Sequence, residues 1–162
     1  MLGSLFAKQE RVTSDPCVSS GRILVVDDEP AIRALLKKII ERRGFTVDGA
    51  RDGAEAIELV RKHRYNLILV DLMMPNVNGF ELVDYLSQQP GDPRPAVIII
   101  TAAAEGTLLR ELDTAIVHSI IRKPFDIDVV ADLVEAAALS VSMPNEDQDQ
   151  DEGDNVLPFP AC

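Results

Sequence analysis

The chain has 162 residues, about the length of one domain with some length left over. Apolar residues make up 46% of the chain but aromatic residues only 4%, so a core has to be built from aliphatic side chains. The formal net charge is -11, and residues 22–141 carry 14 basic and 19 acidic residues. This balance argues against the basic stripe of a nucleic-acid-binding surface, so we expect no direct contact with nucleic acid.

The two flanks of the chain differ from its middle. Residues 1–21 mix small and hydroxylated residues without a period and predict a flexible N-terminal arm. Residues 142–162 carry six acidic residues and no basic one, which predicts a disordered acidic C-terminal tail. Cys17 and Cys162 lie in these flanks, so we expect neither a disulfide framework nor a metal cluster from them. Nothing resembles a signal peptide or a membrane span, and we expect a cytoplasmic protein without membrane contact.

The middle of the chain alternates two patterns. Short apolar runs bounded by turn residues predict strands at 22–26, 45–49, 67–70, 96–100 and 119–122. Apolar residues at helical spacing predict a helix after each strand, and the helix with the weakest pattern lies near 105–113. Gly44 ends the first helix, and Asp126 can cap the last one. The alternation predicts a doubly wound α/β domain at 22–141, with a five-stranded parallel sheet covered by five helices.

The first predicted helix has an apolar face and a basic one. The spacing i, i+3, i+4, i+7 and i+8 assigns five residues to the apolar face: Ile32, Leu35, Leu36, Ile39 and Ile40. Its basic residues fill the other face.

Polar residues follow several of the predicted strands directly. In a parallel sheet the carboxyl ends of the strands lie side by side, and chemistry collects just beyond them. We therefore expect one crevice to contain Asp27, Asp28, Glu29, Asp71, Thr101 and Lys123. Each of these residues alone has an ordinary explanation as a cap, a strand end or a solvated charge. Together they bring carboxylates, a hydroxyl and an ammonium to one edge.

The chemistry of this set is specific. Clustered carboxylates repel one another unless a cation joins them, and oxygen ligands without imidazole or thiolate suit Mg²⁺. An ionised aspartate can attack phosphorus to give an acyl phosphate. The transferred phosphoryl oxygens need positive charge and hydrogen-bond donors, which Mg²⁺, Lys123 and Thr101 would supply.

Four segments carry a family resemblance. They read VVDDE at 25–29, VDLMMPNVNG at 70–79, ITA at 100–102 and KPF at 123–125. In order and spacing the chain resembles the receiver domains of two-component response regulators over about residues 22–140. The resemblance implies a flavodoxin-like receiver fold with sheet order 2-1-3-4-5 and makes Asp71 the phosphoacceptor. It also implies a sensor histidine kinase or a histidine phosphotransfer protein as the phosphoryl donor.

The same resemblance assigns roles around Asp71. It implies that Asp28, Asp71 and the backbone carbonyl of Met73 bind Mg²⁺ directly and that Asp27 acts through water. It implies that Thr101 and Lys123 bind the phosphoryl oxygens, and that the peptide bond between Lys123 and Pro124 is cis.

One position departs from the family pattern. Receivers usually carry an aromatic residue three positions before the active-site lysine, and that ring moves inward when the threonine closes on the phosphoryl group. Here the position is Ile120. We therefore assign the switch to Thr101 and Ile120, without aromatic gating of the output face.

The residues leave two other functions open. An aspartate-nucleophile, Mg²⁺-dependent phosphohydrolase would place its nucleophile after the first strand, where Asp27 and Glu29 could imitate its two acids. A flavodoxin-like cofactor binder would need a phosphate loop there, and three acids would repel a phosphate. We favour a stand-alone receiver that catalyses only its own phosphorylation and dephosphorylation. Its output would be contact with a downstream protein not yet identified, or onward phosphotransfer.

Overall fold

The structure is a computed structural model, and it describes residues 21–91, 93–102, 110, 112 and 115–141. The predicted arm at 1–21, apart from its last residue, and the predicted tail at 142–162 lie outside these residues. The predicted helix at 105–113 lies outside them as well, except for two positions. These three predictions therefore stay predictions.

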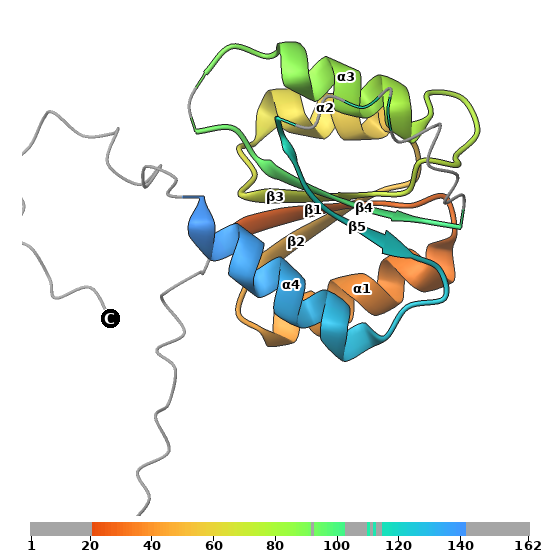
Figure 1. Cartoon of the computed structure of the whole chain (residues 1–162), viewed down its shortest axis with the longest axis vertical. Coiled ribbons are helices and arrows are strands. Elements are labelled where there is room, and N and C mark those ends of the chain that lie inside the picture. The colour runs from red at the N-terminus through yellow and green to blue at the C-terminus, as the bar shows by residue number, and fades with distance from the viewer. Residues whose placement is uncertain (1–20, 92, 103–109, 111, 113–114, 142–162) are drawn as a thin grey trace, which may run out of the picture.

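Five parallel strands form one sheet in the order β2-β1-β3-β4-β5 (Figure 1). The strands are β1 (Arg22–Val26), β2 (Thr46–Ala50), β3 (Leu67–Val70), β4 (Ala96–Thr101) and β5 (Val117–Arg122). Each strand differs from its predicted range by at most two residues at either end. Strand β3 lies at the centre, buried along its whole length.

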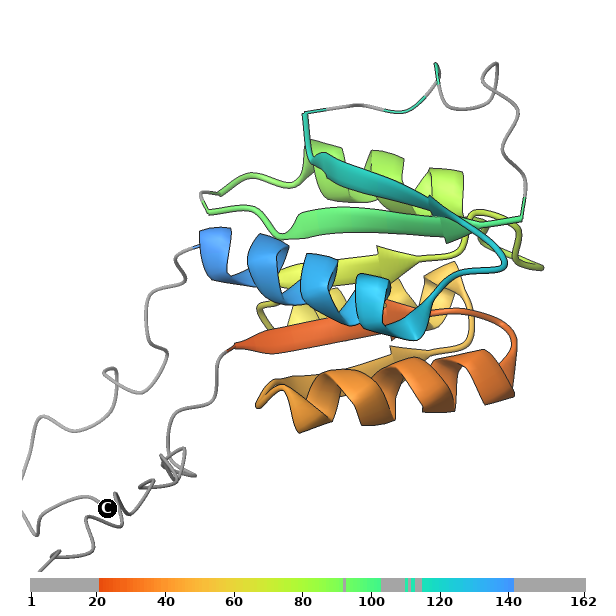
Figure 2. The ribbon, with the colours of Figure 1, turned by 60° about the horizontal axis from the view of Figure 1, so that its bottom comes forward.

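Four helices are present among the described residues, and they cover both faces of the sheet. They are α1 (Pro30–Arg42), α2 (Gly53–Lys62), α3 (Gly79–Gln88) and α4 (Ile127–Ser140). Helices α1 and α4 cover one face, and α2 and α3 cover the other (Figures 1 and 2). The predicted fold class, the strand order and the covering of both sheet faces by helices are confirmed. In the part of the chain that the structure describes, no helix has both the length and the apolar character needed to span a membrane.

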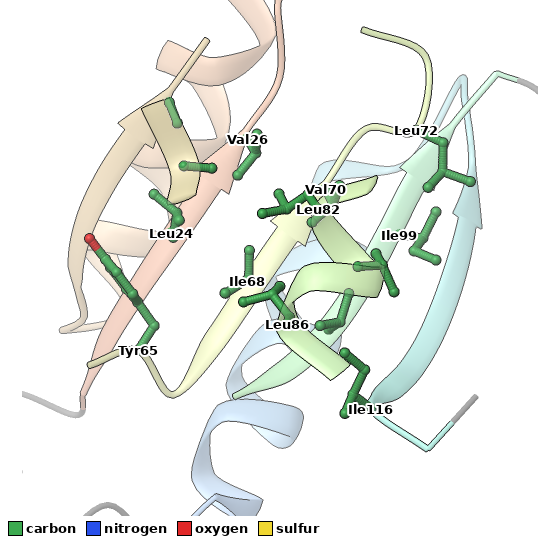
Figure 3. Packing of buried hydrophobic residues seen from close by; sticks show 14 of the residues in the cluster. Leu24, Val26, Tyr65, Ile68, Val70, Leu72, Leu82, Leu86, Ile99 and Ile116 are labelled. Carbon is green, nitrogen blue, oxygen red and sulfur yellow. The ribbon is translucent and has the colours of Figure 1, made fainter. Parts of the chain in front are cut away.

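The core consists of two clusters, one on each face of the sheet. Successive residues of a strand point to opposite faces, so Leu24 and Val26 join the cluster under α2 and α3. Ile23 and Val25 join the cluster under α1 and α4. Figure 3 shows the first cluster, where Tyr65 packs among aliphatic side chains. Burying each Leu or Ile side chain contributes about 1.5–3 kcal/mol to the free energy of unfolding, so the packed sheet holds the residues at its edge in defined positions.

Polar side chains begin three of the helices. Asp52 accepts a hydrogen bond from the backbone N–H of Glu55 at 2.8 Å, and Asn78 accepts one from Glu81 at 3.0 Å. The predicted cap Asp126 accepts one from Asp128 at 2.9 Å. Each bond satisfies an amide that the helix itself leaves without a partner.

The predicted apolar face of α1 is wrong at one residue. Leu36 and Ile40 are buried, but Leu35 is 41% exposed. Consecutive residues of an α-helix are turned by about 100°, so Leu35 lies at the rim of the stripe that Leu36 and Ile40 define. A face assigned from spacing alone includes such rim positions because it does not show how wide a stripe the sheet covers.

Candidate functional site

The residues that directly follow three of the strands continue the hydrogen-bond ladder at the edge of the sheet where the strands end. Asp71 donates its backbone N–H to the carbonyl of Val26 at 2.9 Å, and Asp27 donates to Ala50 at 3.1 Å. Lys123 donates its backbone N–H to the carbonyl of Thr101 at 3.0 Å. The ladder thus aligns residues from the carboxyl ends of β1, β3, β4 and β5 at one edge.

A lysine joins two buried carboxylates at this edge. Lys123 Nζ lies 3.0 Å from Asp27 Oδ2 and 2.9 Å from Asp71 Oδ2. Asp27 and Asp71 are only 2% and 5% exposed. Burial lowers the pKa of the Lys123 ammonium, but the hydrogen bonds and charges of Asp71 and Asp27 outweigh burial and raise that pKa above its ordinary value. Lys123 is therefore charged at neutral pH and holds the two carboxylates together.

Asp28 adds a third carboxylate. One carboxylate oxygen from each of Asp27, Asp28 and Asp71 lies within 4.8 Å of the other two. Asp28 is exposed, so the cluster opens to solvent on its side. Three carboxylates with one ammonium leave an excess of negative charge, and hard oxygen donors are what Mg²⁺ prefers. The donor set therefore fits a divalent cation.

Glu29 was expected in the same crevice, and it contributes there through its backbone. Its N–H donates to Asp27 Oδ1 at 2.9 Å, while the residue itself is exposed. The acid cluster among the described residues contains Asp27, Asp28 and Asp71 without Glu29. Glu29 is the N-cap residue of the helix that begins at Pro30, and its side chain makes no capping hydrogen bond.

The loop after Asp71 is held close to β3. Met73 donates its backbone N–H to Asp71 Oδ1 at 3.0 Å, while the Met73 residue is 57% exposed. Asn76 has a φ of 64°, a left-handed conformation that asparagine tolerates. A Cβ at Gly79 would collide with the backbone of Asp71 and Leu72, so only glycine fits there. The turn after Asp71 therefore requires glycine at its end, where the chain passes close to β3. Within the turn, the backbone of Met73 lies beside the Asp71 carboxylate.

The other predicted site residues lie on β4, on β5 or directly after β5. Thr101 ends β4 and is fully buried, beside β5 in the ladder. The peptide bond between Lys123 and Pro124 is cis, as the resemblance implied. Ile120 is 41% exposed on the edge strand β5. The switch roles of Thr101 and Ile120 stay predictions.

Arg33 is a residue of this region that the sequence did not indicate. Its Nη1 donates to the backbone carbonyl of Asp27 at 2.6 Å, although we assigned the basic residues of this helix to the face opposite the apolar one. Arg33 lies three positions before Leu36 and seven before Ile40, the buried residues of α1, so helical spacing places it beside the buried stripe and was the available signal.

A second polar cluster lies at the opposite edge of the sheet. Asp48 Oδ2 accepts a hydrogen bond from Arg22 Nε at 2.7 Å and one from the Tyr65 hydroxyl at 2.7 Å. A hollow of about 890 Å³ also opens at this edge, and the described residues that line it include Arg94 and His118 but no carboxylate. The hollow therefore lies at the other edge of the sheet from the acid cluster, and its lining residues differ from the cluster in having no carboxylate.

Comparison with known proteins gives one consistent result. Residues 23–135 match the response regulator receiver domain family. The chain is 34% identical over 140 residues to the transcriptional regulatory protein SrrA of Staphylococcus aureus, which covers 86% of this chain and 57% of SrrA. It is 32% identical over 125 residues to a gliding motility regulatory protein of Myxococcus xanthus, covering 76% of this chain and 16% of that protein. The chain therefore spans less than two thirds of either relative.

A solved structure is similar over the same region. The response regulator protein TrrA of Thermotoga maritima, in complex with Mg²⁺-BeF, superposes with a TM-score of 0.62 at 31% identity. The match covers 72% of this chain and 97% of that one.

Proposed function

The chain belongs to the response regulator receiver domain family, and we propose that Asp71 is the residue that accepts its phosphoryl group. The observation that carries this assignment is the position of the Asp71 carboxylate. It lies at the end of the central strand, 5% exposed, 2.9 Å from the Lys123 ammonium and within the three-carboxylate cluster. Among the three acids, Asp71 alone follows the central strand β3.

The proposed reaction is a transfer of the phosphoryl group to carboxylate oxygen. An oxygen of ionised Asp71 forms a bond to phosphorus as the donor's bond to phosphorus breaks and the donor leaves with that electron pair. The Met73 amide and the Lys123 ammonium already hold the two carboxylate oxygens, at 3.0 and 2.9 Å, and so orient the carboxylate. Lys123, with the Thr101 hydroxyl, would then donate to the phosphoryl oxygens, where charge accumulates during transfer.

The proposal includes Mg²⁺ bound by Asp28, Asp71 and the Met73 backbone carbonyl, with Asp27 acting through water. When bound, Mg²⁺ neutralises charge on the phosphoryl oxygens. Support comes from the excess of carboxylate oxygens over cations at the site and from the Mg²⁺-BeF complex of the related TrrA protein. Asp27, with both oxygens already in hydrogen bonds, would hold Lys123 in place.

The partners and the output belong to the same proposal. The donor would be a sensor histidine kinase or a histidine phosphotransfer protein in the cytoplasm. The output would be contact with a downstream protein or onward phosphotransfer, without direct contact with nucleic acid, because residues 22–141 carry 14 basic and 19 acidic residues. The exposed side of β5 around Ile120 is the surface that we propose for this contact.

The proposed chemistry is limited to phosphorylation and dephosphorylation of the chain itself. A phosphohydrolase that used Asp27 as its nucleophile is the alternative. Asp27 and Asp71 are both buried and both accept hydrogen bonds at their two carboxylate oxygens, so burial does not separate the two functions. The match of residues 23–135 to the receiver family is what favours Asp71. Repeated cleavage of a phosphomonoester by one molecule would contradict the receiver assignment.

Intact mass spectrometry after incubation with Mg²⁺ and acetyl phosphate tests the proposal. We expect one phosphoryl group on the wild-type chain and none on Asp71→Asn or in the presence of EDTA. Asp48→Asn is the matched control, because Asp48 is an acid in a hydrogen-bonded cluster at the other edge of the sheet. That variant should still be phosphorylated. An adduct that persists in folded Asp71→Asn, or that is absent from the wild type, would overturn the assignment.

A further inference from the structure

Arg33 connects α1 to the acidic loop after β1. The residue lies in the first turn of α1, where its backbone N–H donates to the carbonyl of Glu29 at 3.0 Å. Its side chain turns back, and Nη1 donates to the backbone carbonyl of Asp27 at 2.6 Å. A charged donor makes this one of the stronger kinds of hydrogen bond, and Arg33 is half-buried rather than spread over the surface.

The carbonyl that Arg33 holds belongs to the peptide between Asp27 and Asp28. The other polar groups of Asp27 are held from elsewhere. Its N–H donates to Ala50, one carboxylate oxygen accepts from the Glu29 amide, and the other accepts from Lys123. Arg33 therefore fixes the orientation of the peptide that leads to Asp28, the exposed carboxylate of the cluster.

Gly49 in β2 leaves room for the Arg33 side chain. A Cβ at position 49 would lie 3.2 Å from Arg33 Cδ and 3.3 Å from Cγ, closer than ordinary contacts. Gly49 is not among the glycines with positive φ, so its backbone would accept alanine. The absence of a side chain on one element thus permits the contact made by another.

We propose that Arg33 is a positioning residue for divalent-cation binding, which it supports by holding the Asp27–Asp28 peptide so that the Asp28 carboxylate stays in the cluster. This inference rests on the proposed function, in which Asp28 is a ligand of Mg²⁺. Charge alone predicts the opposite effect, because a cation close to three carboxylates disfavours a second cation. Removal of Arg33 therefore weakens Mg²⁺ binding if it positions Asp28 and strengthens binding if it acts only as a charge.

The test is a MgCl₂ titration of the full chain, followed through backbone amide resonances by NMR. Arg33→Met should weaken Mg²⁺ binding about tenfold, the usual loss when a residue supporting a metal ligand is removed. Arg33→Lys, which keeps a charged donor, should recover part of that affinity. Gly49→Ala should weaken binding in the same direction by a smaller factor, although it changes no charge. Lys38→Met, which removes an exposed cation from the same helix, is the control and should bind as the wild type does.

The outcomes separate this inference from the function on which it rests. A wild-type chain that does not bind Mg²⁺ would refute the metal site itself. If the wild type binds and Arg33→Met binds equally or more tightly, the positioning role is wrong. The resonances report on folded molecules, so a general loss of stability does not imitate a loss of affinity. If Arg33→Met does not fold, Gly49→Ala decides, and unchanged affinity in that variant would overturn the inference.

Discussion

The two edges of the sheet each carry a hydrogen-bonded charge cluster, but the clusters differ in balance. At the amino edge one carboxylate, Asp48, meets one guanidinium, Arg22, at 2.7 Å and also accepts from the Tyr65 hydroxyl. At the carboxyl edge three carboxylates cluster, and two of them, Asp27 and Asp71, pair with one ammonium, Lys123. The amino-edge cluster is therefore neutral in sum, whereas the carboxyl-edge cluster has charge left for a further cation.

The pKa shifts at the amino edge come from burial and from groups that pair with one another within the cluster. Burial raises the pKa of the Asp48 carboxyl, but hydrogen bonds from Arg22 and Tyr65 outweigh burial and hold it below its usual range. Burial and the hydrogen bond to Asp48 raise the pKa of the Tyr65 hydroxyl. This cluster ties β1 and β2 to the residues that precede β3. The two edges therefore differ in charge balance: the carboxylate at the amino edge is matched by a guanidinium, whereas the carboxyl edge has more carboxylates than cations.

The largest predicted difference between the edges concerns loss of the cation. Lys123→Met leaves two buried carboxylates unpaired and should lower the free energy of unfolding by about 3–5 kcal/mol. Arg22→Met should cost only about 1 kcal/mol, because the side chains of Arg22 and Asp48 are 33% and 26% exposed and solvent screens their attraction. Urea denaturation at neutral pH without divalent cations measures both losses. Equal losses would mean that the two clusters do not differ in this way.

The next difference is the response to Mg²⁺. A site for Mg²⁺ in the folded chain stabilises that state, by about 1.4 kcal/mol at a concentration ten times Kd. We expect this gain for the wild type and for Asp48→Asn, and no gain for Asp28→Asn. Urea denaturation with and without MgCl₂ measures it. A gain that survives in Asp28→Asn would place the cation elsewhere.

A smaller effect is expected from the buried hydroxyl of the amino edge. Tyr65→Phe removes the hydrogen bond to Asp48 and should cost about 1 kcal/mol at pH 7, with phosphorylation unchanged. The folded pKa of Tyr65 is raised, so its contribution is complete below pH 10.0, the ordinary tyrosine value, and is lost as the pH rises toward the folded value. Above pH 10 the stability of the wild type should therefore fall more steeply than that of Tyr65→Phe. Parallel slopes in denaturation experiments at pH 9 to 11 would contradict the shift.

The smallest effect is expected at Ile120, on the outer strand β5. Ile120 is 41% exposed, and Ile120→Thr keeps a β-branched side chain, so the free energy of unfolding should change by at most about 0.5 kcal/mol. Phosphorylation of Asp71, read by intact mass, should be unchanged because Ile120 is not part of the carboxylate cluster. A reduced adduct would indicate that the Ile120 side chain takes part in the closing of Thr101.

Much of this architecture follows from local patterns in the sequence. Short apolar runs specify strands because a strand buried on both faces has no polar position, and Asp126 caps a helix because its carboxylate reaches amides two and three residues on. The acids and the lysine at the site were predictable because each follows a strand directly, and parallel strands end at one edge. The resemblance to a family supplied the roles expected of these residues. It also implied the cis bond before Pro124.

Other features depended on the direction of side chains in the folded chain. Lys123 meets Asp27 across 96 positions of sequence and Asp71 across 52, and spacing does not specify an ion pair between such distant residues. Arg33 of α1 turns toward the acidic loop, and Gly49 on β2 leaves room for its side chain. Local sequence thus determined the elements and the edge where the site forms. Only tertiary packing decided which charges pair, because pairing depends on distances between elements that no local pattern encodes.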